Sequence, residues 1–361
     1  MSGAAAPVPE GAAPHRRRPR YPGKYPRKFE QRYKERDPAR HADTIAKVLA
    51  SGKTPAGTHR PIMVAEVLGA LAPRPGDLAV DCTLGHGGHA REILPRLMPG
   101  GRLIGIDADP IELPRAEARL RGLGFGPDAL SAHLSNFAGL PKVLAAEGVA
   151  GADVILADLG VSSMQIDDPG RGFSIKAEGP PDMRMNPRRG QPAWALLAKT
   201  GRDALAALLQ ENADEPCAGE LADAIAGREF ATARALADAI RRALPRAAEE
   251  AREGAVRRVF QALRIAVNDE LGALDALLRV LPSCLNPGGR VAILTFHSGE
   301  DRRVKKAFEA GLAAGQYAEV AREVIRPTPA ERHANPRSSP AKLRWARMQD
   351  RLTRRLPHRL P

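Results

Sequence analysis

An aspartate, a cluster of glycines and two histidines stand together in one short stretch of the chain. Residues 80–94 read VDCTLGHGGHAREIL, with three glycines inside four positions, between a short apolar run and a helix-like segment. Glycines at such a place let the backbone approach a nucleotide-like ligand, because a side chain there would put a Cβ in the way. Residues 85–90 also fit the pattern G-x-G-x-x-G/A, which alone is a weak indicator of dinucleotide binding.

Two carboxylates near this loop indicate which kind of ligand it can bind. Asp107 ends the next strand-like stretch, 22 positions after Gly85, where a carboxylate can accept hydrogen bonds from ribose hydroxyls. Both NAD and S-adenosylmethionine (SAM) carry such a ribose, so Asp107 does not separate them. Asp81 stands just before the loop, where it would repel a pyrophosphate and attract the ammonium group of SAM. From these residues SAM is favoured over NAD, with a purely structural turn third.

Strand-like and helix-like stretches alternate from Thr58 onward, which predicts an α/β fold with a parallel, doubly wound sheet. The strand-like stretches are DLAVDC, GRLIGIDAD, ADVILADLG and, after a turn at NPGG, RVAILTF; the helix-like ones are MVAEVLGAL and HAREILPRL. Between Asp167 and Arg257 the strands disappear and Ala/Leu/Arg-rich segments with helical spacing take over. We therefore expect a helical insertion in the sheet domain.

One strong helix is expected over residues 256–274. Its apolar positions recur at three- and four-residue steps: Val256, Phe260, Leu263, Val267, Leu271 and Leu274. A parallel polar stripe, which includes Arg264 and Asn268, lies one residue further on. By its spacing alone this stripe is either a solvated flank of the helix or a face toward a ligand.

Composition excludes several classes of protein. The 361 residues are 43% hydrophobic, enough for a folded core, and there is neither a long uncharged apolar stretch nor an apolar leader, so we expect a cytoplasmic protein. Its three cysteines, Cys82, Cys217 and Cys284, have neither a disulfide framework nor zinc-ligand spacing, and no metal site is expected.

Most of the net charge of +13 lies at the two ends of the chain. Residues 1–58 hold 13 basic against 5 acidic residues, and residues 317–361 hold 11 against 4. Such ends suit either a phosphate backbone or solvent. The expected organisation is a basic disordered arm (1–57), a first core part (58–170), a helical insertion for substrate recognition (171–256), a second core part (257–350) and a basic tail (351–361).

Eight ordered stretches carry a resemblance to a known family. They read HRPIMVAEVL, DCTLGHGGHA, IDADP, DLGVSSMQIDDPGRGFS, GPPDMRMNP, FQALRIAVNDEL, FHSGEDRRVK and NPRSSPAKLR. In order and spacing the chain resembles the ribosomal small-subunit RNA cytosine-N4 methyltransferases (the RsmH or MraW family), from His59 to Arg344.

The resemblance implies a Rossmann-like SAM-binding sheet with a helical insertion, and methylation of the exocyclic N4 amine of a cytidine in 16S ribosomal RNA. The implied partner is this RNA or the assembled small subunit; a homodimer is left open. By match to the family, Gly87, Gly88 and His89 approach the methionine end of SAM and Asp107 the ribose. The remaining implied contacts are Phe137 near the adenine, and Asp158 and Gln165 in the pocket. The resemblance also favours Arg264 and Asn268 facing the active-site cleft.

A group that accepts a proton from the amine is the remaining requirement, because the amine's lone pair is delocalised into the cytosine ring. Asp158 ends the strand-like stretch DVILAD, at the sheet edge where α/β folds bind ligands, and is the first candidate. His297 with its neighbour Ser298, and Asp182, are the alternatives. Two other functions stay open: a SAM-fold nucleic-acid-binding protein without turnover, and an NAD-dependent oxidoreductase.

Overall fold

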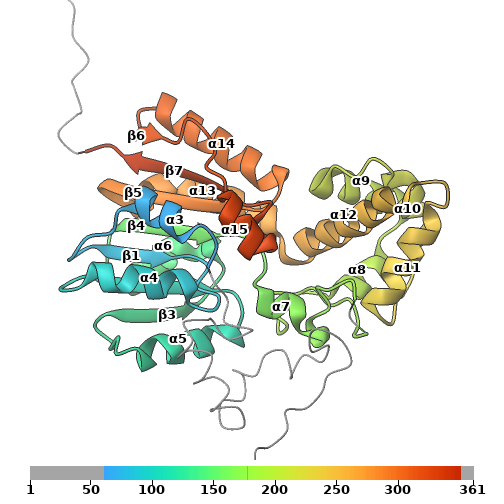
Figure 1. The fold of residues 1–361 in the computed structure, drawn as a ribbon, viewed down its shortest axis with the longest axis horizontal. Coiled ribbons are helices and arrows are strands. Elements are labelled where there is room, and N and C mark those ends of the chain that lie inside the picture. Colours follow the sequence, from blue (N-terminus) through green and yellow to red (C-terminus); the bar gives the residue numbers. More distant parts are fainter. Residues whose placement is uncertain (1–60, 177, 351–361) are drawn as a thin grey trace, which may run out of the picture. The chain divides into compact units, whose positions relative to one another are not determined.

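The computed structural model describes residues 61–176 and 178–350. The predicted basic arm and basic tail lie outside the described residues. The described chain forms an α/β domain around one sheet with the strand order β3-β2-β1-β4-β5-β7-β6 (Figure 1). The strands are β1 (Leu78–Asp81), β2 (Arg102–Asp107), β3 (Leu130–Leu134), β4 (Ala152–Asp158), β5 (Leu285–Thr295), β6 (Tyr317–Val320) and β7 (Lys342–Met348).

The expectation of a wholly parallel sheet is wrong at one edge. Strands β1 to β5 pair in parallel, but β7 pairs antiparallel with both β5 and β6. After β6 the chain returns and inserts between its two neighbours, which an antiparallel strand can do without a crossover over the sheet. The apolar run RVAILTF lies within β5, which begins earlier, at Leu285; the expected turn at NPGG coincides with a shift in its register against β4. The short strands β3, β6 and β7 were not predicted.

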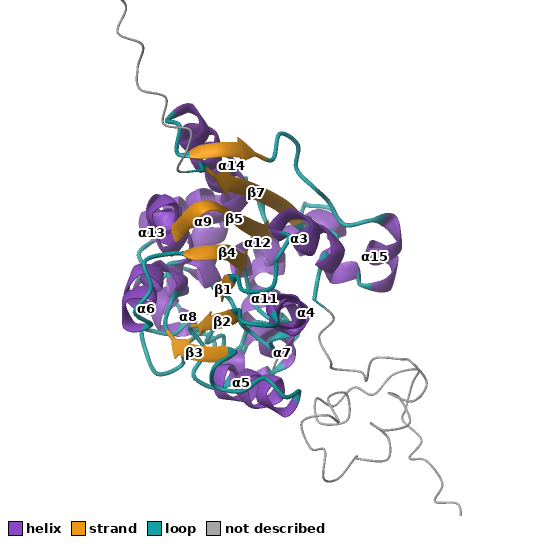
Figure 2. Ribbon diagram, turned by 90° about the vertical axis from the view of Figure 1, so that its left-hand side faces the viewer, coloured by secondary structure: helices purple, strands orange, loops and turns teal. Residues whose placement is uncertain are grey.

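Helices cover both faces of the sheet (Figure 2). One face packs against α3 (Val64–Leu71), α4 (Gly88–Leu97) and α5 (Glu112–Gly122), the other against α6 (Leu140–Ala146), α13 (Glu270–Cys284) and α14 (Ser298–Ala313). Alternate residues of β4 serve the two cores: Val154 and Leu156 lie in the first, Ile155 and Ala157 in the second. A strand buried on both faces reads as the continuous apolar run seen in the sequence.

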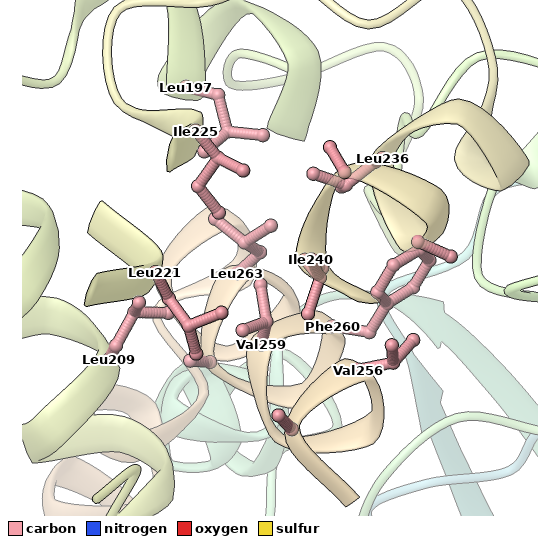
Figure 3. Close-up of a cluster of buried hydrophobic side chains, with 14 of the residues drawn as sticks. Leu197, Leu209, Leu221, Ile225, Leu236, Ile240, Val256, Val259, Phe260 and Leu263 are labelled. Atoms are coloured by element: carbon pink, nitrogen blue, oxygen red, sulfur yellow. The ribbon is translucent and has the colours of Figure 1, made fainter. Parts of the chain in front are cut away.

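The predicted helical insertion has a core of its own (Figure 3). It consists of α8 (Ala193–Lys199), α9 (Arg202–Ala213), α10 (Ala218–Ile225), α11 (Ala233–Ala243) and α12 (Glu249–Asn268). Leu209, Leu221 and Ile240 pack with Val259 and Leu263 of α12, and all five side chains are fully buried. None of the helices in the described ranges is long and apolar enough to cross a membrane.

The single helix expected over residues 256–274 is wrong. Helix α12 begins earlier, at Glu249, and ends at Asn268; α13 starts at Glu270. Asp269 between them has the left-handed φ of 49°, which an aspartate tolerates better than most residues. The apolar spacing continues through this break, so periodicity could not detect it. As a result, Phe260 packs in the insertion core and Leu274 in the sheet core. The expected domain boundary after residue 256 falls within α12.

Candidate functional site

A cavity of about 510 Å³ lies at the carboxyl ends of β1, β2 and β4, the edge where open α/β sheets bind their ligands. Of the site residues predicted from the sequence, the lining includes Gly88, His89, Asp107, Phe137, Asp158 and Gln165. Those that do not line it are Gly87, Asp182 and His297. Two groups of lining residues face this space. The glycine-loop wall is Asp81, Gly88, His89 and Asp107; the insertion wall is Met185, Arg264, Asn268 and Glu270.

The glycine loop joins β1 to α4 by a tight turn. Gly87 caps α4 with a left-handed φ of 79°, a conformation that glycine adopts without cost. A Cβ on Gly88 would meet the Pro61 ring at 3.2 Å. The backbone N–H of Gly85 donates to Asp107 Oδ2 at 2.6 Å. The loop glycines thus shape a close approach of backbone to the end of β2.

Two aspartates, Asp81, which is buried, and Asp107, which is half-buried, give the glycine-loop wall its charge. Asp107 also accepts the backbone N–H of Asp109 at 2.8 Å, and Asp81 accepts that of Thr83 at 3.1 Å. Burial raises the pKa of each of these two aspartates from 3.8 to about 6. Together with Asp158, these two aspartates place three carboxylates at the strand ends of the cavity, which suit a ligand that carries positive charge and repel a pyrophosphate. The sulfonium and ammonium groups of SAM fit this set, and NAD does not.

One carboxylate oxygen of Asp158 lacks a hydrogen-bond partner in the described part of the chain. Its backbone N–H donates to the Thr83 hydroxyl at 2.6 Å, and its Oδ2 lies 3.5 Å from His89 Nε2. Its Oδ1 is buried and has no hydrogen-bond partner among the described residues. Burial acts to lower the pKa of His89, but the Asp158 carboxylate outweighs it and raises this pKa above 6.5. Asp158 therefore offers an acceptor oxygen at the sheet edge, next to the His89 imidazole.

The alternative proton acceptors have other partners. His297 caps α14: its Nδ1 accepts the Glu300 N–H at 3.4 Å. Asp182 accepts from the Arg184 guanidinium at 2.8 and 2.7 Å. The Ser298 hydroxyl donates to Asp214 at 3.4 Å in an exposed position. None of these three residues lines the cavity, whereas Glu300, which the sequence did not single out, does.

A buried ion pair connects the end of β2 with a distant loop. Asp109 Oδ2 accepts from Arg171 Nη1 and from Gln165 Nε2, each at 2.8 Å. Arg171 Nη2 donates to the carbonyls of Arg184, at 3.1 Å, and Met185, at 2.8 Å. Gln165, in α7 (Ser163–Asp167), thus supports the cavity as well as lining it. These bonds set Met185 in the insertion wall.

The end of α12 holds the same loop from the other side. Asn268 Oδ1 accepts the Met185 N–H at 2.7 Å, and its Nδ2 donates to the Met183 carbonyl at 2.8 Å. One turn earlier, Arg264 donates from Nε and Nη2 to the two oxygens of Glu270, at 2.8 and 2.9 Å. Arg264 and Asn268 both line the cavity, so the expectation that they face the cleft is confirmed. Asp109 and Arg171 were missed because no local pattern marks partners 62 residues apart in the chain. Glu270, six residues from Arg264, was missed because it follows a helix break that the apolar spacing does not show.

This strand order, with a glycine loop after β1 and an acidic cavity at the strand ends, defines a Rossmann-like SAM-dependent methyltransferase. The comparison with known families names it further: the model of the MraW methylase family matches residues 56–349, and the chain belongs to that family. The predicted family and cofactor are thereby confirmed, and the NAD-dependent alternative is removed.

Curated relatives extend over nearly the whole chain. "Ribosomal RNA small subunit methyltransferase H 1" of Lachnoclostridium phytofermentans is 47% identical over 92% of this chain and 93% of its own length. "Ribosomal RNA small subunit methyltransferase H 2" of Alkaliphilus metalliredigens is 47% identical over 91% and 97%. Among solved structures, a putative rRNA-methylase from Clostridium thermocellum covers 81% of this chain and 99% of its own, at 10% identity and a TM-score of 0.40.

Proposed function

We propose that the protein transfers a methyl group from SAM to the exocyclic N4 amine of a cytidine in small-subunit ribosomal RNA. The substrate class follows from the relatives named above and the resemblance of the eight motifs. The observation that carries the chemistry is the buried, unpartnered Oδ1 of Asp158 in the cavity of the glycine-loop wall.

The glycine-loop wall would hold SAM. Asp107 accepts from its ribose hydroxyls, Asp81 faces its ammonium group, and Gly88 and His89 adjoin its methionine end. Phe137, which is half-buried at the cavity, adjoins the adenine. When bound, SAM supplies an electrophilic methyl carbon.

Asp158 would activate the acceptor amine. Its Oδ1 accepts an N–H of the amine, which localises the nitrogen lone pair, and then holds the proton as the amine becomes methylated. His89 faces Oδ2 and fixes the direction of the carboxylate. The walls of the cavity keep the amine in line, which is the larger part of the rate acceleration in a displacement of this kind. The target base must leave its stack to enter.

The insertion and the chain ends would recognise the larger substrate. The insertion supplies Arg264 and Asn268 to the cavity, and the basic segments 1–57 and 351–361 would contact phosphates without sequence preference. We propose that the protein acts in the cytoplasm on the RNA or on the assembled small subunit. The homodimer stays a prediction.

Mass mapping of methylated nucleosides in small-subunit RNA from cells with and without the gene tests the proposal. One N4-methylated cytidine should disappear with the gene and return with the wild-type protein. Asp158→Asn should not restore it. Asp153→Asn is the matched control: it lies in the same strand, and its side chain accepts from Leu78 N and Asn286 Nδ2, away from the cavity. Unchanged RNA after loss of the gene, or full rescue by Asp158→Asn, would contradict the proposal.

A further inference from the structure

Of the two arginines that line the cavity, Arg264 is the more enclosed: its side chain is 17% exposed, against 40% for Arg337. It projects from α12 one turn before that helix ends at Asn268, and it faces Glu270 at the start of α13. Two of its three guanidinium nitrogens, Nε and Nη2, each donate to a different oxygen of that carboxylate. This two-point pairing fixes the plane of the guanidinium. The position of the third nitrogen is therefore also fixed.

That third nitrogen, Nη1, has no acceptor in the described part of the chain. This nitrogen is also not fully enclosed by protein atoms. Because Arg264 lines the cavity, Nη1 is available to donate to a ligand there. A donor kept in place by its own ion pair loses little conformational entropy when it binds, since the side chain is already ordered.

The charges around Arg264 indicate what kind of ligand Nη1 suits. Both Glu270 and Glu300 act on the guanidinium. Burial acts to raise the pKa of Glu300, but its hydrogen bond and charge interaction with His297 outweigh burial and lower it. Glu270 thus pairs with the Arg264 guanidinium and Glu300 lies 3.3 Å from His297, so among the described residues this part of the cavity has no unpaired positive charge for a phosphate or a carboxylate. A neutral group with an acceptor atom fits instead.

We propose that Arg264 Nη1 binds the acceptor edge of the target cytosine by donating to its ring nitrogen N3, and that Glu270 is the positioning residue that holds the guanidinium for this. The inference rests on the proposed function, in which Asp158 in the same cavity accepts from the amine next to N3. Cytosine presents a lone pair at N3, whereas uracil presents an N–H there. A fixed donor at this point therefore selects cytosine and rejects uracil.

Other lining residues fit a flat, neutral base on this side of the cavity. Phe296, at the end of β5, and Met185 both line it and are half-buried. An aromatic ring and a thioether pack against a base without reading its identity. Recognition is thus left to the hydrogen-bonding donor.

The test uses small-subunit RNA in which the mapped target cytidine is replaced by 3-deazacytidine, where a C–H replaces N3. Single-turnover methylation of this RNA and of unmodified RNA is measured with wild type and with Arg264→Lys. Wild type should lose roughly 10- to 100-fold in rate on the analogue, the cost of one hydrogen bond from a charged donor. Arg264→Lys should be slow on both and lose less than about 3-fold between them, since a lysine cannot pair with both oxygens of Glu270 and still place a donor at N3.

Arg258→Lys is the matched control. Arg258 lies on the same helix, and its Nε donates to the fully buried Glu215 at 2.7 Å, but it does not line the cavity. This variant should keep the wild-type ratio between the two RNAs whatever it loses in stability. If Arg264→Lys does not fold, Arg264→Met combined with Glu270→Leu replaces the pair with apolar residues, an exchange that buried ion pairs often tolerate.

The outcomes separate the two proposals. A wild-type protein that methylates no cytidine in unmodified RNA contradicts the proposed function. A wild type that is active but shows the same ratio between the two RNAs as Arg264→Lys, or as the double variant, overturns the role of Arg264. The intrinsic effect of the altered ring is common to all these proteins and cancels in the comparison.

Discussion

The two walls of the cavity are built in different ways. In the glycine-loop wall, Asp81 and Asp107 accept backbone N–H groups two residues further along the chain, and Asp107 also accepts that of Gly85, 22 residues back. In the insertion wall, Asn268 binds a backbone N–H 83 residues away. Arg171, which supports this wall, binds a carboxylate 62 residues away. The first wall is encoded by neighbouring residues, and the second forms only when the insertion docks on the sheet. A substitution in the glycine loop should therefore alter the first wall and leave the second intact. Loss of one long-range side chain, such as Arg171, should instead disrupt the second wall.

Arg171→Ala should have the largest effect, because it removes the side chain that connects the two walls. Asp109 and Arg171 are both buried, and removing one partner of a buried pair leaves an uncompensated charge, which costs about 3–5 kcal/mol. We expect a loss of this size in the free energy of unfolding by urea. Arg115→Ala is the control: Arg115 pairs with Glu112 but is 48% exposed, so its loss should cost less than about 1 kcal/mol. Equal losses for the two variants would show that Arg171 does not connect the walls.

Asp81→Asn should stabilise the ligand-free protein at pH 7.5. The pKa of Asp81 in the folded protein is raised from 3.8 to about 6, so the folded state binds the proton more tightly than the unfolded state does. The resulting stability is complete below pH 3.8 and is lost as the pH rises through 6. Asparagine does not ionise and still offers an oxygen to Thr83. A shift of about two units corresponds to up to about 3 kcal/mol.

The measurement is the Tm of both proteins from pH 4 to 7.5 without SAM. The advantage of Asp81→Asn should fade as the pH falls below 6, while its affinity for SAM should be lower than that of wild type at pH 7.5. Asp107 titrates in the same range and its charge interacts with that of Asp81, so the comparison is repeated in an Asp107→Asn background. Tm curves that stay parallel over this pH range would refute the buried charge at Asp81.

Asp107→Ala sharpens the comparison from the ligand side. It removes the carboxylate proposed to accept from the SAM ribose, and should weaken SAM binding by about 1–3 kcal/mol, the cost of leaving a buried partner unpaired. Calorimetric titration measures this change. Because the insertion wall does not depend on Asp107, hydrogen exchange in α12 should stay as in wild type. Unchanged SAM affinity would exclude Asp107 from the binding site.

Gly87→Ala should have the smallest effect. Its left-handed φ costs a residue with a Cβ about 1 to 2 kcal/mol, and the new methyl group would meet Leu120 at 3.3 Å. We expect a modest fall in Tm and a small loss of SAM affinity. Gly148→Ala, with a φ of 69° and open space around it, is the control for backbone strain away from the cavity. If both variants bind SAM equally well, Gly87 has no part in shaping the cofactor site.

The same contrast explains what could be predicted from the sequence. The glycine loop, Asp81, Asp107 and Asp158 were predicted because strand ends and loop residues leave a local pattern. The break at Asp269 was not, since the apolar spacing runs through it unchanged. The antiparallel β7 was missed because its place depends on pairing with β5 rather than on its own residues. Arg171 acts through a partner 62 residues away that only the folded chain brings near, and Glu270 pairs with Arg264 across the unpredicted helix break. The resemblance to a family supplied Arg264 and Asn268 where periodicity left two choices.

The hydrogen bonds of Asn268, which donates to the Met183 carbonyl and accepts from the Met185 N–H, join the segment that leads into the insertion to the helix that leads out of it. The segment between β4 and β5 therefore leaves the sheet and returns to it at places that are joined by these hydrogen bonds. During synthesis β4 emerges long before β5, its neighbour in the sheet, so the chain must wait with an unpaired strand edge. When the insertion folds its own core before β5 emerges, the loop that remains to be closed is shorter. This reduces the entropic cost of pairing β5 with β4.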